Sequence, residues 1–427
     1  MTSVNPAGTK LSPRQRKAIV AGTIGNTVEW VDWALYSIFA KIISVEFFPG
    51  GDETVALLST LAVFAVGFVM RPVGAAVLGA YADRHGRKKG LTLTVGLMAG
   101  ASFIIALTPN YGMIGVLAPM ILLIARLLQG FSAGGEFGSS SAFLVESAAR
   151  GRRAFAGSWQ QVSVGGGVLI ASLLGTIATS TLDEQDLHGW GWRVAFVLGG
   201  LLGLVGLWLR ISVEETDSFT STAGRRRVNP LKAMFTEHPG AALRVAGITI
   251  AGTLTYYIWV NYLPTYANIT TGIPLSQALL SQTLCLVVFV VLLPFAGLVS
   301  DRFGRKPTLG VFAGGFVVLA WPMLHLLDNS FLSVFLVQLT GMLFLLGYSA
   351  NCAVIMAEQF PPEVRATGIA LPYALAVAVF GGTAPYVTTW LNEIGHRDLL
   401  WLYVSGSALI SLVVYLTMPE TKDKEFD

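Results

Sequence analysis

The sequence predicts an all-α integral membrane protein with twelve transmembrane helices in two pseudo-symmetric six-helix bundles. Three observations lead to this prediction. Hydrophobic residues make up 53% of the 427 residues and charged residues only 12%, which leaves too little polar surface to coat a soluble protein of this length. Apolar segments long enough to cross about 30 Å of hydrocarbon recur along the chain. A short basic motif also occurs twice, about half a chain apart.

The apolar segments divide into two sets of six. The first set lies near residues 17–42, 54–82, 90–108, 113–146, 154–180 and 191–211. The second set lies near residues 241–267, 275–299, 307–327, 331–357, 365–390 and 398–418. The fourth segment is longer than a bilayer requires, so we expect its inner end to project into the cytosol. The predicted domains are an N-terminal bundle (1–211), a cytoplasmic linker (212–240) and a C-terminal bundle with a short cytoplasmic tail (241–427).

The repeated motif reads Gly79-Ala-Tyr-Ala-Asp83-Arg84-His-Gly86-Arg87-Lys88 and Gly297-Leu-Val-Ser-Asp301-Arg302-Phe-Gly304-Arg305-Lys306. Asp83 and Asp301 lie 218 residues apart. A second pattern repeats with nearly the same offset: Glu146 followed by Arg153 after the fourth span, and Glu358 followed by Arg365 after the tenth. Both matches indicate two homologous halves in tandem, and the offset is far longer than a solenoid repeat.

Lysine and arginine gather in the loops on one side of the predicted spans, including both motif loops and the two chain ends. The positive-inside rule therefore predicts that both termini and the motif loops are cytoplasmic. The net charge of +3 follows from this topology and does not indicate nucleic-acid binding. We expect no cleavable signal peptide. Cys285 and Cys352 fall within apolar spans, where buried packing is expected instead of a disulfide or metal site.

The motif loops place a carboxylate where a helix dipole is negative. Asp83 ends a span at its cytoplasmic side, so it needs a compensating partner such as a neighbouring helix N-terminus or Arg87. Gly86 permits the tight turn, and the same reasoning applies to Asp301. The alternative role is a static topology anchor. We predict a cytoplasmic gate that comprises Gly79, Asp83, Arg84, Gly86, Arg87, Gly297, Asp301, Arg302, Gly304, Arg305, Glu146, Arg153, Glu358 and Arg365.

Five charged residues fall well inside predicted spans: Glu29, Asp32, Arg71, Arg126 and Glu136. Each would cost about 2.5–3.5 kcal/mol if it faced lipid, so they must face one another or water. Glu29 and Asp32 share a helical face, and Arg126 lies at comparable depth, which predicts that an acid pairs with Arg126. A pair that opens and closes would capture and release a proton, whereas a permanent ion pair is the alternative. The predicted proton-coupling residues are Asp32, Arg126, Glu29 and Glu136.

Arg71 lies twelve residues before Asp83, hence about 18 Å from the cytoplasmic end of its helix. A planar cation at this depth suits a carboxylate substrate, although pairing with Glu29 is an equally reasonable role. The C-terminal half offers aromatic and amide groups instead of mid-span charges. With Arg71, the predicted substrate-binding residues are Gln160, Gln161, Tyr256, Tyr257, Asn261, Tyr348, Asn351 and Tyr373.

Three further strings accompany the motif loops: Gly25-Asn26-Thr-Val-Glu29-Trp30-Val-Asp32, Arg71-Pro72-Val-Gly74 and Arg126-Leu-Leu-Gln129-Gly130-Phe-Ser-Ala-Gly134-Gly135-Glu136. With them the chain resembles the major facilitator superfamily over essentially its whole length, and within it the metabolite:proton symporters. The resemblance implies that Asp32 and Arg126 form the proton-coupling pair. It also implies substrates such as 2-oxoglutarate, citrate or shikimate, or zwitterions such as proline and betaine.

The predicted function is secondary active symport of a small organic acid with a proton, by alternating access. Uptake of a zwitterion, an uncoupled facilitator or exporter, and a transporter-like receptor are the alternatives. No nucleophile–base constellation or metal-ligand cluster occurs in the sequence, so we expect neither an enzyme nor a cofactor or metal. The expected partners are a small-molecule substrate, a proton and the lipid bilayer. We expect a functional monomer that crosses the cytoplasmic membrane many times.

Overall fold

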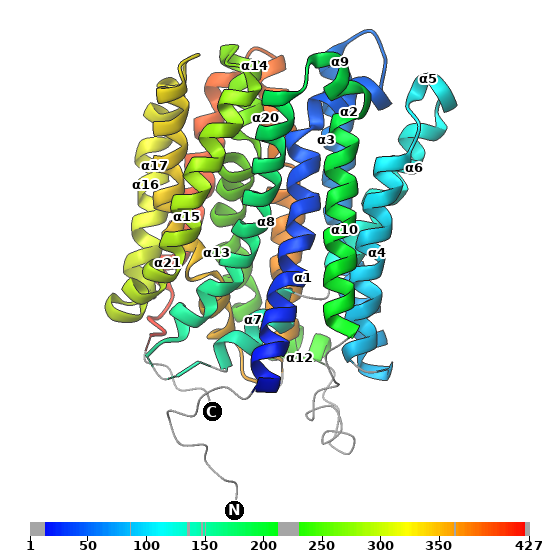
Figure 1. Cartoon of the computed structure of the whole chain (residues 1–427). Coiled ribbons are helices and arrows are strands. Elements are labelled where there is room, and N and C mark those ends of the chain that lie inside the picture. Colours follow the sequence, from blue (N-terminus) through cyan, green and yellow to red (C-terminus); the bar gives the residue numbers. More distant parts are fainter. Residues whose placement is uncertain are drawn as a thin grey trace, which may run out of the picture.

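A computed structural model describes residues 13–85, 87–134, 137–146, 148–149, 151–211, 230–362 and 364–422. These residues form a bundle of long helices that run between two opposite faces of the molecule (Figure 1). The first half contains α1 (Pro13–Ile38), α2 (Ala40–Phe47), α3 (Glu53–His85), α4 (Arg87–Leu107), α5 (Tyr111–Ile114), α6 (Leu117–Ala133), α7 (Phe137–Glu146), α8 (Arg153–Thr181), α9 (Glu184–Asp186), η1 (Leu187–Gly191) and α10 (Trp192–Ile211).

The second half repeats this arrangement of long helices. It contains α12 (Pro230–Thr236), α13 (Pro239–Tyr256), η2 (Tyr257–Tyr262), α14 (Leu263–Thr271), α15 (Leu275–Phe303), α16 (Arg305–His325), α17 (Phe331–Ser349), α18 (Cys352–Ala357), α19 (Arg365–Ala376), η3 (Val377–Gly381), α20 (Ala384–Glu393), η4 (Arg397–Leu399) and α21 (Leu400–Thr417). The segments η2 and η3 are π-helical turns. Each one continues a helix toward the same face of the molecule.

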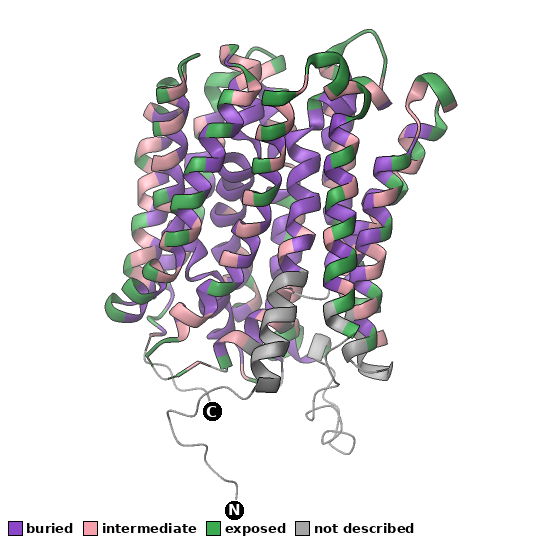
Figure 2. Cartoon of the chain, viewed as in Figure 1, coloured by how far each residue is buried: buried purple, intermediate pink, exposed green. Residues whose placement is uncertain are grey.

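Within the described residues, nine helices are long and apolar enough to cross a membrane, and two shorter apolar helices cover Thr92–Leu107 and Leu117–Ala133. Each of the twelve predicted spans overlaps a helix. The fourth is divided into α5, α6 and α7, and α7 packs against α8, α18 and α19. The outer faces of the bundle carry exposed apolar side chains such as Leu243 and Val318, whereas the interior is buried (Figure 2). Exposed apolar faces around a buried interior suit a lipid environment.

The face that carries the second motif loop, Gly297–Lys306, is the one that the charge distribution predicts to be cytoplasmic, and we use that name for it. α1 begins at this face, and α12 lies beside it (Figure 1). Residues 212–229, most of the predicted linker, lie outside the described part of the chain. The boundaries of the two bundles therefore stay a prediction.

The two halves meet chiefly along α8 and α15, which lie side by side (Figure 1). Toward the face opposite the cytoplasmic one, which we call the outer face, this contact between α8 and α15 is polar but uncharged. Ser172 and Thr283 lie 2.8 Å apart, and Thr176 lies 3.1 Å from Thr283. Ser37 of α1 also donates to the backbone oxygen of Asn261 at 3.1 Å. These bonds close the outer side of the interface between the halves.

Helices α3 and α6 approach each other to backbone contact. A Cβ atom added at Gly130 would lie 1.7 Å from the oxygen of Gly67, and one added at Gly134 would lie 1.9 Å from the oxygen of Arg71. Only glycine fits at both positions. Such small-residue contacts let transmembrane helices pack closely. They place the two arginines of the site, Arg71 on α3 and Arg126 on α6, near each other.

Candidate functional site

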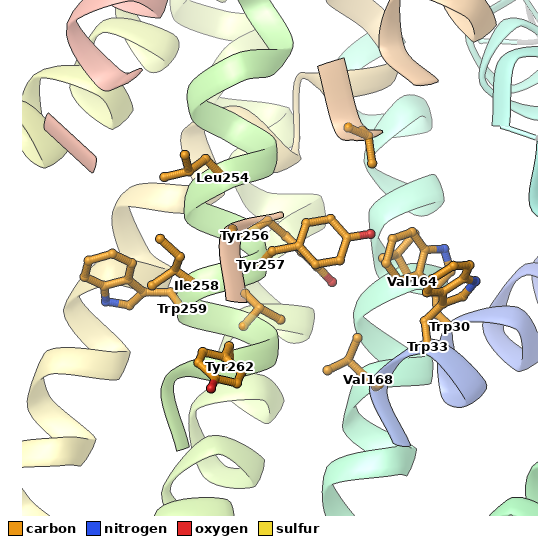
Figure 3. Packing of buried hydrophobic residues seen from close by; sticks show 14 of the residues in the cluster. Trp30, Trp33, Val164, Val168, Leu254, Tyr256, Tyr257, Ile258, Trp259 and Tyr262 are labelled. Carbon is orange, nitrogen blue, oxygen red and sulfur yellow. The ribbon is translucent and has the colours of Figure 1, made fainter. Parts of the chain in front are cut away.

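Aromatic rings from both halves enclose the centre of the molecule. Trp30 of α1 packs against Tyr256 and Tyr257, with ring centroids 6.1 and 6.3 Å apart. Trp33 packs against Phe68 at 4.3 Å. Figure 3 shows the rings of Tyr256 and Tyr257 turned toward Trp30 and Trp33, whereas Trp259 of the same turn points away. The junction of α13 and η2 thus presents two adjacent tyrosines to the opposite half.

Two arginine side chains reach into this aromatic enclosure. The guanidinium carbon of Arg71 lies 4.6 Å from the ring centroid of Trp33 and 4.4 Å from that of Phe68. The guanidinium carbon of Arg126 lies 4.6 Å from Trp33 and 3.9 Å from the ring of Tyr36. Arg71 is 5% exposed and Arg126 is fully buried. Cation–π contacts offset part of the cost of burying these charges.

Both guanidinium groups keep N–H donors that no described residue accepts. These atoms are Nε and Nη2 of Arg71 and Nε and Nη2 of Arg126. A buried charged donor without a hydrogen-bond partner is costly. The two arginines therefore form a cationic centre with unused donor capacity.

Asp32 and Arg126 are joined through two neutral side chains. Ser102 of α4 donates to Oδ2 of Asp32, and Nε2 of Gln129 donates to Ser102 at 3.3 Å. Arg126 Nη1 donates to Oε1 of Gln129 at 2.5 Å. Among the residues that the structure describes, Asp32 and Arg126 make no direct ion pair. The predicted mutual pairing is corrected to this indirect connection, because the serine and glutamine occupy the space between the charges.

Four other predicted substrate-binding residues also present unpaired polar atoms in the buried interior. These are Nε2 of Gln160, the hydroxyls of Tyr256 and Tyr257, and Nδ2 of Asn261. All four side chains are at most 5% exposed. Together with the arginines they supply mainly hydrogen-bond donors. The centre is therefore chemically complementary to a small acceptor-rich molecule.

The remaining predicted substrate-binding residues have partners of their own. Gln161 lies beside Cys352, and Cys352 donates to the hydroxyl of Tyr348 at 3.5 Å. Tyr373 stacks on Phe137 of α7 at 3.9 Å, with the rings nearly parallel. This stack closes the cytoplasmic side of the interface between the halves.

Asn351 belongs to the cytoplasmic end of the second half, away from the central cluster. Its Nδ2 donates to Oγ1 of Thr308 and to the oxygen of Gly347, and its Oδ1 accepts from Ser300 at 2.5 Å. Both amide N–H groups are used, so no donor remains for a ligand. The predicted substrate contact is corrected to a structural link between α15, α16 and α17.

Asp301 of the second motif loop has the kind of partner that the sequence predicts. Its two oxygens accept the backbone N–H groups of Ala154 and Phe155 at 2.9 Å. These groups open α8 in the other half, where the helix dipole is positive. Gly297 allows α15 to approach, because a Cβ there would lie 2.8 Å from the oxygen of Ala154.

Arg305 connects the same loop to the end of α18. It pairs with Asp301 at 2.9 Å and with Glu358 at 3.2 Å. Gly304 has a φ of +107°, a conformation that requires glycine at this turn. Arg302 lies over the ring of Phe303 at 5.3 Å, and its backbone oxygen accepts from Lys422 at 2.8 Å.

The chain after α21 completes this cluster. Glu420 accepts the backbone N–H groups of Arg305 and Lys306 at 2.9 and 3.0 Å, and Thr421 donates to Glu358 at 2.5 Å. Partial burial alone would raise the pKa of Glu420, but backbone N–H donors led by those of Arg305 and Lys306 hold it below its ordinary value. A carboxylate at a helix N-terminus satisfies free backbone donors.

The duplicated acid–arginine pairs meet across the two halves. Glu146 contacts Arg365 at 2.5 Å, and Arg153 attracts the carboxylate of Glu358 electrostatically. Each acid thus faces the arginine of the opposite repeat. The pattern is the one that a pseudo-twofold relation between homologous halves produces.

Several predicted site residues cannot be placed. Gly86 and Glu136 lie outside the described residues, as do the side chains of Asp83, Arg84 and Arg87 and the surroundings of Gly79. Glu29 is half-buried on α1 and has an interaction partner. Within the described ranges, no group of His, Cys, Asp or Glu side chains could hold a metal ion.

Sequence reasoning did not assign roles to Ser102, Gln129 or Glu420. Gln129 lies three residues after Arg126, so helical spacing could have indicated it as a partner. Glu420 lies close to two basic residues of the chain end, but only the fold brings it to α16. A lone serine in an apolar span, such as Ser102, gives no signal that separates it from a packing residue.

The chain is similar to a protein family and to several individual transporters. A model of the Major Facilitator Superfamily matches residues 23–372. The alpha-ketoglutarate permease of Escherichia coli (strain K12) is 38% identical over 403 residues, covering 94% of this chain and 93% of that protein. The citrate-proton symporter of Klebsiella pneumoniae is 39% identical over 404 residues, covering 93% and 90%. The proline/betaine transporter of E. coli K12 is 32% identical over 423 residues, covering 96% and 84%.

The fold also matches solved structures. The proton:xylose symporter XylE bound to 6-bromo-6-deoxy-D-glucose superimposes with a TM-score of 0.76 at 18% identity, covering 96% of this chain and 97% of that one. This similarity concerns the fold alone. The chain belongs to the Major Facilitator Superfamily, as a transporter and not an enzyme, and it is a multi-pass protein of the inner (cytoplasmic) membrane.

Proposed function

We propose that the chain is a proton-coupled symporter that carries a small organic acid by alternating access. The observation that supports it most is the pair of buried guanidinium groups with unpaired N–H donors, Arg71 and Arg126, one of which is linked to the carboxylate of Asp32. In this proposal the bundles 1–211 and 241–427 move about the central site, and linker 212–240 joins them. A functional monomer is part of this proposal.

A carboxylate fits the unused donors better than a neutral solute does. Arginine binds carboxylates through two parallel, charge-assisted hydrogen bonds. Such a ligand would also add a negative charge beside the two buried cations, which have only Asp32 linked to them in the hydrogen-bond chain. Gln160, Tyr256, Tyr257 and Asn261 add neutral donors for the remaining oxygens of an organic acid. The relatives named for alpha-ketoglutarate and citrate support this class of substrate.

The aromatic rings favour an acid over a betaine-like zwitterion. Aromatic cages bind quaternary ammonium groups through cation–π contacts. Here Arg71 and Arg126 already lie over Trp33, Phe68 and Tyr36. Transport of proline or betaine stays the alternative, since a proline/betaine transporter is also among the relatives.

Asp32 supplies a reason for coupling to protons. A negative Asp32 weakens the attraction of the cationic centre for an anion, and protonation of Asp32 removes this effect. The anion therefore binds more tightly when Asp32 is protonated, and the proton binds more tightly when the anion is bound, because such coupling is reciprocal. The citrate-proton symporter among the relatives supports the same ion.

Transport in proteoliposomes tests the proposal. Labelled 2-oxoglutarate, citrate, shikimate, proline and betaine are offered with and without an inward proton gradient. We expect accumulation of at least one organic acid, which the gradient drives and a protonophore abolishes. Uptake that ignores the gradient would instead indicate a facilitator or exporter. Accumulation of proline or betaine alone would overturn the assigned substrate class.

The variant Asp32→Asn tests the coupling site. It keeps the shape of the side chain but cannot bind and release a proton. We expect loss of proton-driven accumulation with retention of substrate exchange. Loss of both activities would mean that Asp32 binds substrate or has a structural role.

A further inference from the structure

Ser102 of α4 lies between the charged groups of the site. It is fully buried; its Oγ donates to Oδ2 of Asp32 and accepts from Nε2 of Gln129 at 3.3 Å. Gln129, also fully buried, accepts from Arg126 at 2.5 Å. One serine and one glutamine therefore form a continuous hydrogen-bond chain between Asp32 and Arg126.

The Ser102 hydroxyl has a second acceptor within reach. The backbone oxygen of Met98, one helical turn earlier, lies 3.0 Å from Oγ. A hydroxyl has one proton and two lone pairs, so it can donate to Asp32 or to Met98 but not to both. When Asp32 is charged, the hydroxyl donates to Oδ2. When Asp32 is protonated, Oδ2–H can donate to Oγ while the Ser102 proton turns to Met98.

Gln129 remains bonded in both arrangements. Its N–H occupies one lone pair of Oγ, and the other lone pair is free to accept from protonated Asp32. Rotation of one hydroxyl thus keeps a hydrogen bond between Ser102 and Oδ2 of Asp32 in each protonation state. No side chain has to change its rotamer.

The other carboxylate oxygen indicates which atom binds the proton. Oδ1 of Asp32 has no hydrogen-bond partner in the described part of the chain. It faces Gly199 of α10, where a Cβ atom would lie only 2.6 Å away. A proton on Oδ1 would be a buried donor without an acceptor, which is unfavourable. A proton on Oδ2 has Ser102 as its acceptor.

Charged and titratable groups lie near Asp32 on its own helix, where Glu29 is one turn away, and on α3, α6 and η2. Arg126 of α6 and Arg71 of α3 are cations, and Tyr36 of α1 and Tyr257 of η2 are phenols near Arg126. Helix α10 faces Asp32 with Gly199. Ser102 is the side chain that donates a hydrogen bond directly to the carboxylate.

We propose that Ser102 is a positioning residue for the transported proton. Its hydroxyl switches between Asp32 and Met98, while Gln129 keeps its hydrogen bonds to Ser102 and Arg126 in both protonation states of Asp32. This inference rests on the proposed function. On loading, one O–H bond forms at Oδ2 of Asp32 and the Ser102 hydroxyl rotates; on release, that O–H bond breaks and the rotation reverses.

The variant Ser102→Ala tests the switch. Without the hydroxyl, charged Asp32 loses its donor, so the protonated form is favoured. We expect the external pH of half-maximal uptake to rise by about one unit, and Ser102→Thr to restore it. Ser132→Ala is the matched control: Ser132 is a buried serine of α6 that donates to the backbone oxygen of Thr94 at 2.6 Å. Ser132→Ala also removes a hydroxyl between α4 and α6, but one that donates to Thr94 and not to Asp32. The pH midpoint of uptake should therefore stay unchanged.

Gln129→Leu tests the second link. Leucine keeps the volume but releases Arg126, so we expect KM for the substrate to rise several-fold while the pH midpoint moves little. Substrate exchange by each variant reports that it is folded. A midpoint for Ser102→Ala equal to that of Ser132→Ala overturns the inference. If Asp32→Asn still accumulates substrate under a proton gradient, it is the proposed function that fails.

Discussion

The carboxylate of Glu146 contacts the guanidinium of Arg365 at 2.5 Å and joins the two halves at their cytoplasmic ends. The Arg365 side chain is 3% exposed, whereas that of Glu146 is 45% exposed. Arg365 also donates to the backbone oxygens of Ala357 and Phe360. The arginine is therefore held by its own half, and Glu146 is the partner that can separate from it when the halves move.

Glu146→Gln should weaken the closed cytoplasmic side. Since half-exposed ion pairs contribute at most about 1 kcal/mol, we expect the population open to the cytoplasm to rise by up to about fivefold. Electron–electron distance measurements between spin labels at Lys89 and Phe303, with Cys285 and Cys352 replaced by alanine, would detect it. An unchanged distance distribution in Glu146→Gln would mean that the pair does not hold the gate.

Gly130→Ala should separate α3 from α6. The new methyl group would meet the backbone oxygen of Gly67 at 1.7 Å, and backbone cannot move aside as a side chain can. We expect a loss of about 1–3 kcal/mol in stability and weaker substrate binding, because Arg71 and Arg126 are carried by these helices. Thermal unfolding in detergent measures the first effect.

Gly100→Ala is the control for that comparison. Gly100 is an exposed glycine of α4, and a Cβ there would meet nothing within 4 Å. Its melting temperature should stay close to that of the wild type. Equal melting temperatures for the Gly130 and Gly100 variants would contradict the close packing of α3 and α6.

The burial of Asp32, Arg71 and Arg126 in the interior could be predicted from the sequence, for a physical reason. A charge such as Arg126 in an apolar span is so costly against lipid that its burial against polar groups can be inferred directly. The amide of Asn351 carries no such penalty in the sequence. The position of Asn351 in the sequence indicates which face of a helix it lies on, but not its depth in the membrane or its hydrogen-bond partners. An amide with a structural role could therefore not be distinguished from one that contacts a ligand.

The cytoplasmic cluster was predictable to a similar extent. Duplication identified Asp301, Arg305, Glu358 and Arg365, and the helix dipole predicted that Asp301 needs a positive partner. The crosswise contact of Glu146 with Arg365 depends on how the two halves dock. Sequence periodicity describes one helix at a time and contains no information on that docking.

Arg71→Lys should impair substrate binding even though it keeps the positive charge. Lysine keeps the positive charge but loses the planar pair of donors and the stacking on Trp33 and Phe68. Charge-assisted hydrogen bonds contribute about 1.5–3 kcal/mol, so we expect the substrate dissociation constant to rise about tenfold or more. Equilibrium binding to purified protein measures it.

The control for Arg71→Lys is Arg244→Lys. Arg244 of α13 donates to Gly240 of its own helix and lies outside the central cluster. The substrate dissociation constant of Arg244→Lys should match that of the wild type. A tenfold loss in Arg71→Met with none in Arg71→Lys would mean that Arg71 contributes charge alone and does not form a bidentate contact.

Glu420→Gln should destabilise the protein at neutral pH and have less effect in acid. The backbone N–H donors at the start of α16 hold the pKa of Glu420 below its ordinary value of 4.5, although partial burial opposes them. Its contribution to stability is therefore complete above about pH 4.5 and is lost as the pH falls through the folded-state pKa. Because the carboxylate is largely exposed, we expect only about 0.5–1 kcal/mol. Melting temperatures of the variant and wild type should differ at pH 7 and converge toward pH 3.5.

Glu237→Gln, which neutralises an exposed carboxylate between α12 and α13, controls for net charge and should show little difference at either pH. A difference for Glu420→Gln that persists in acid would mean that the shape of the side chain, and not its charge, stabilises the start of α16.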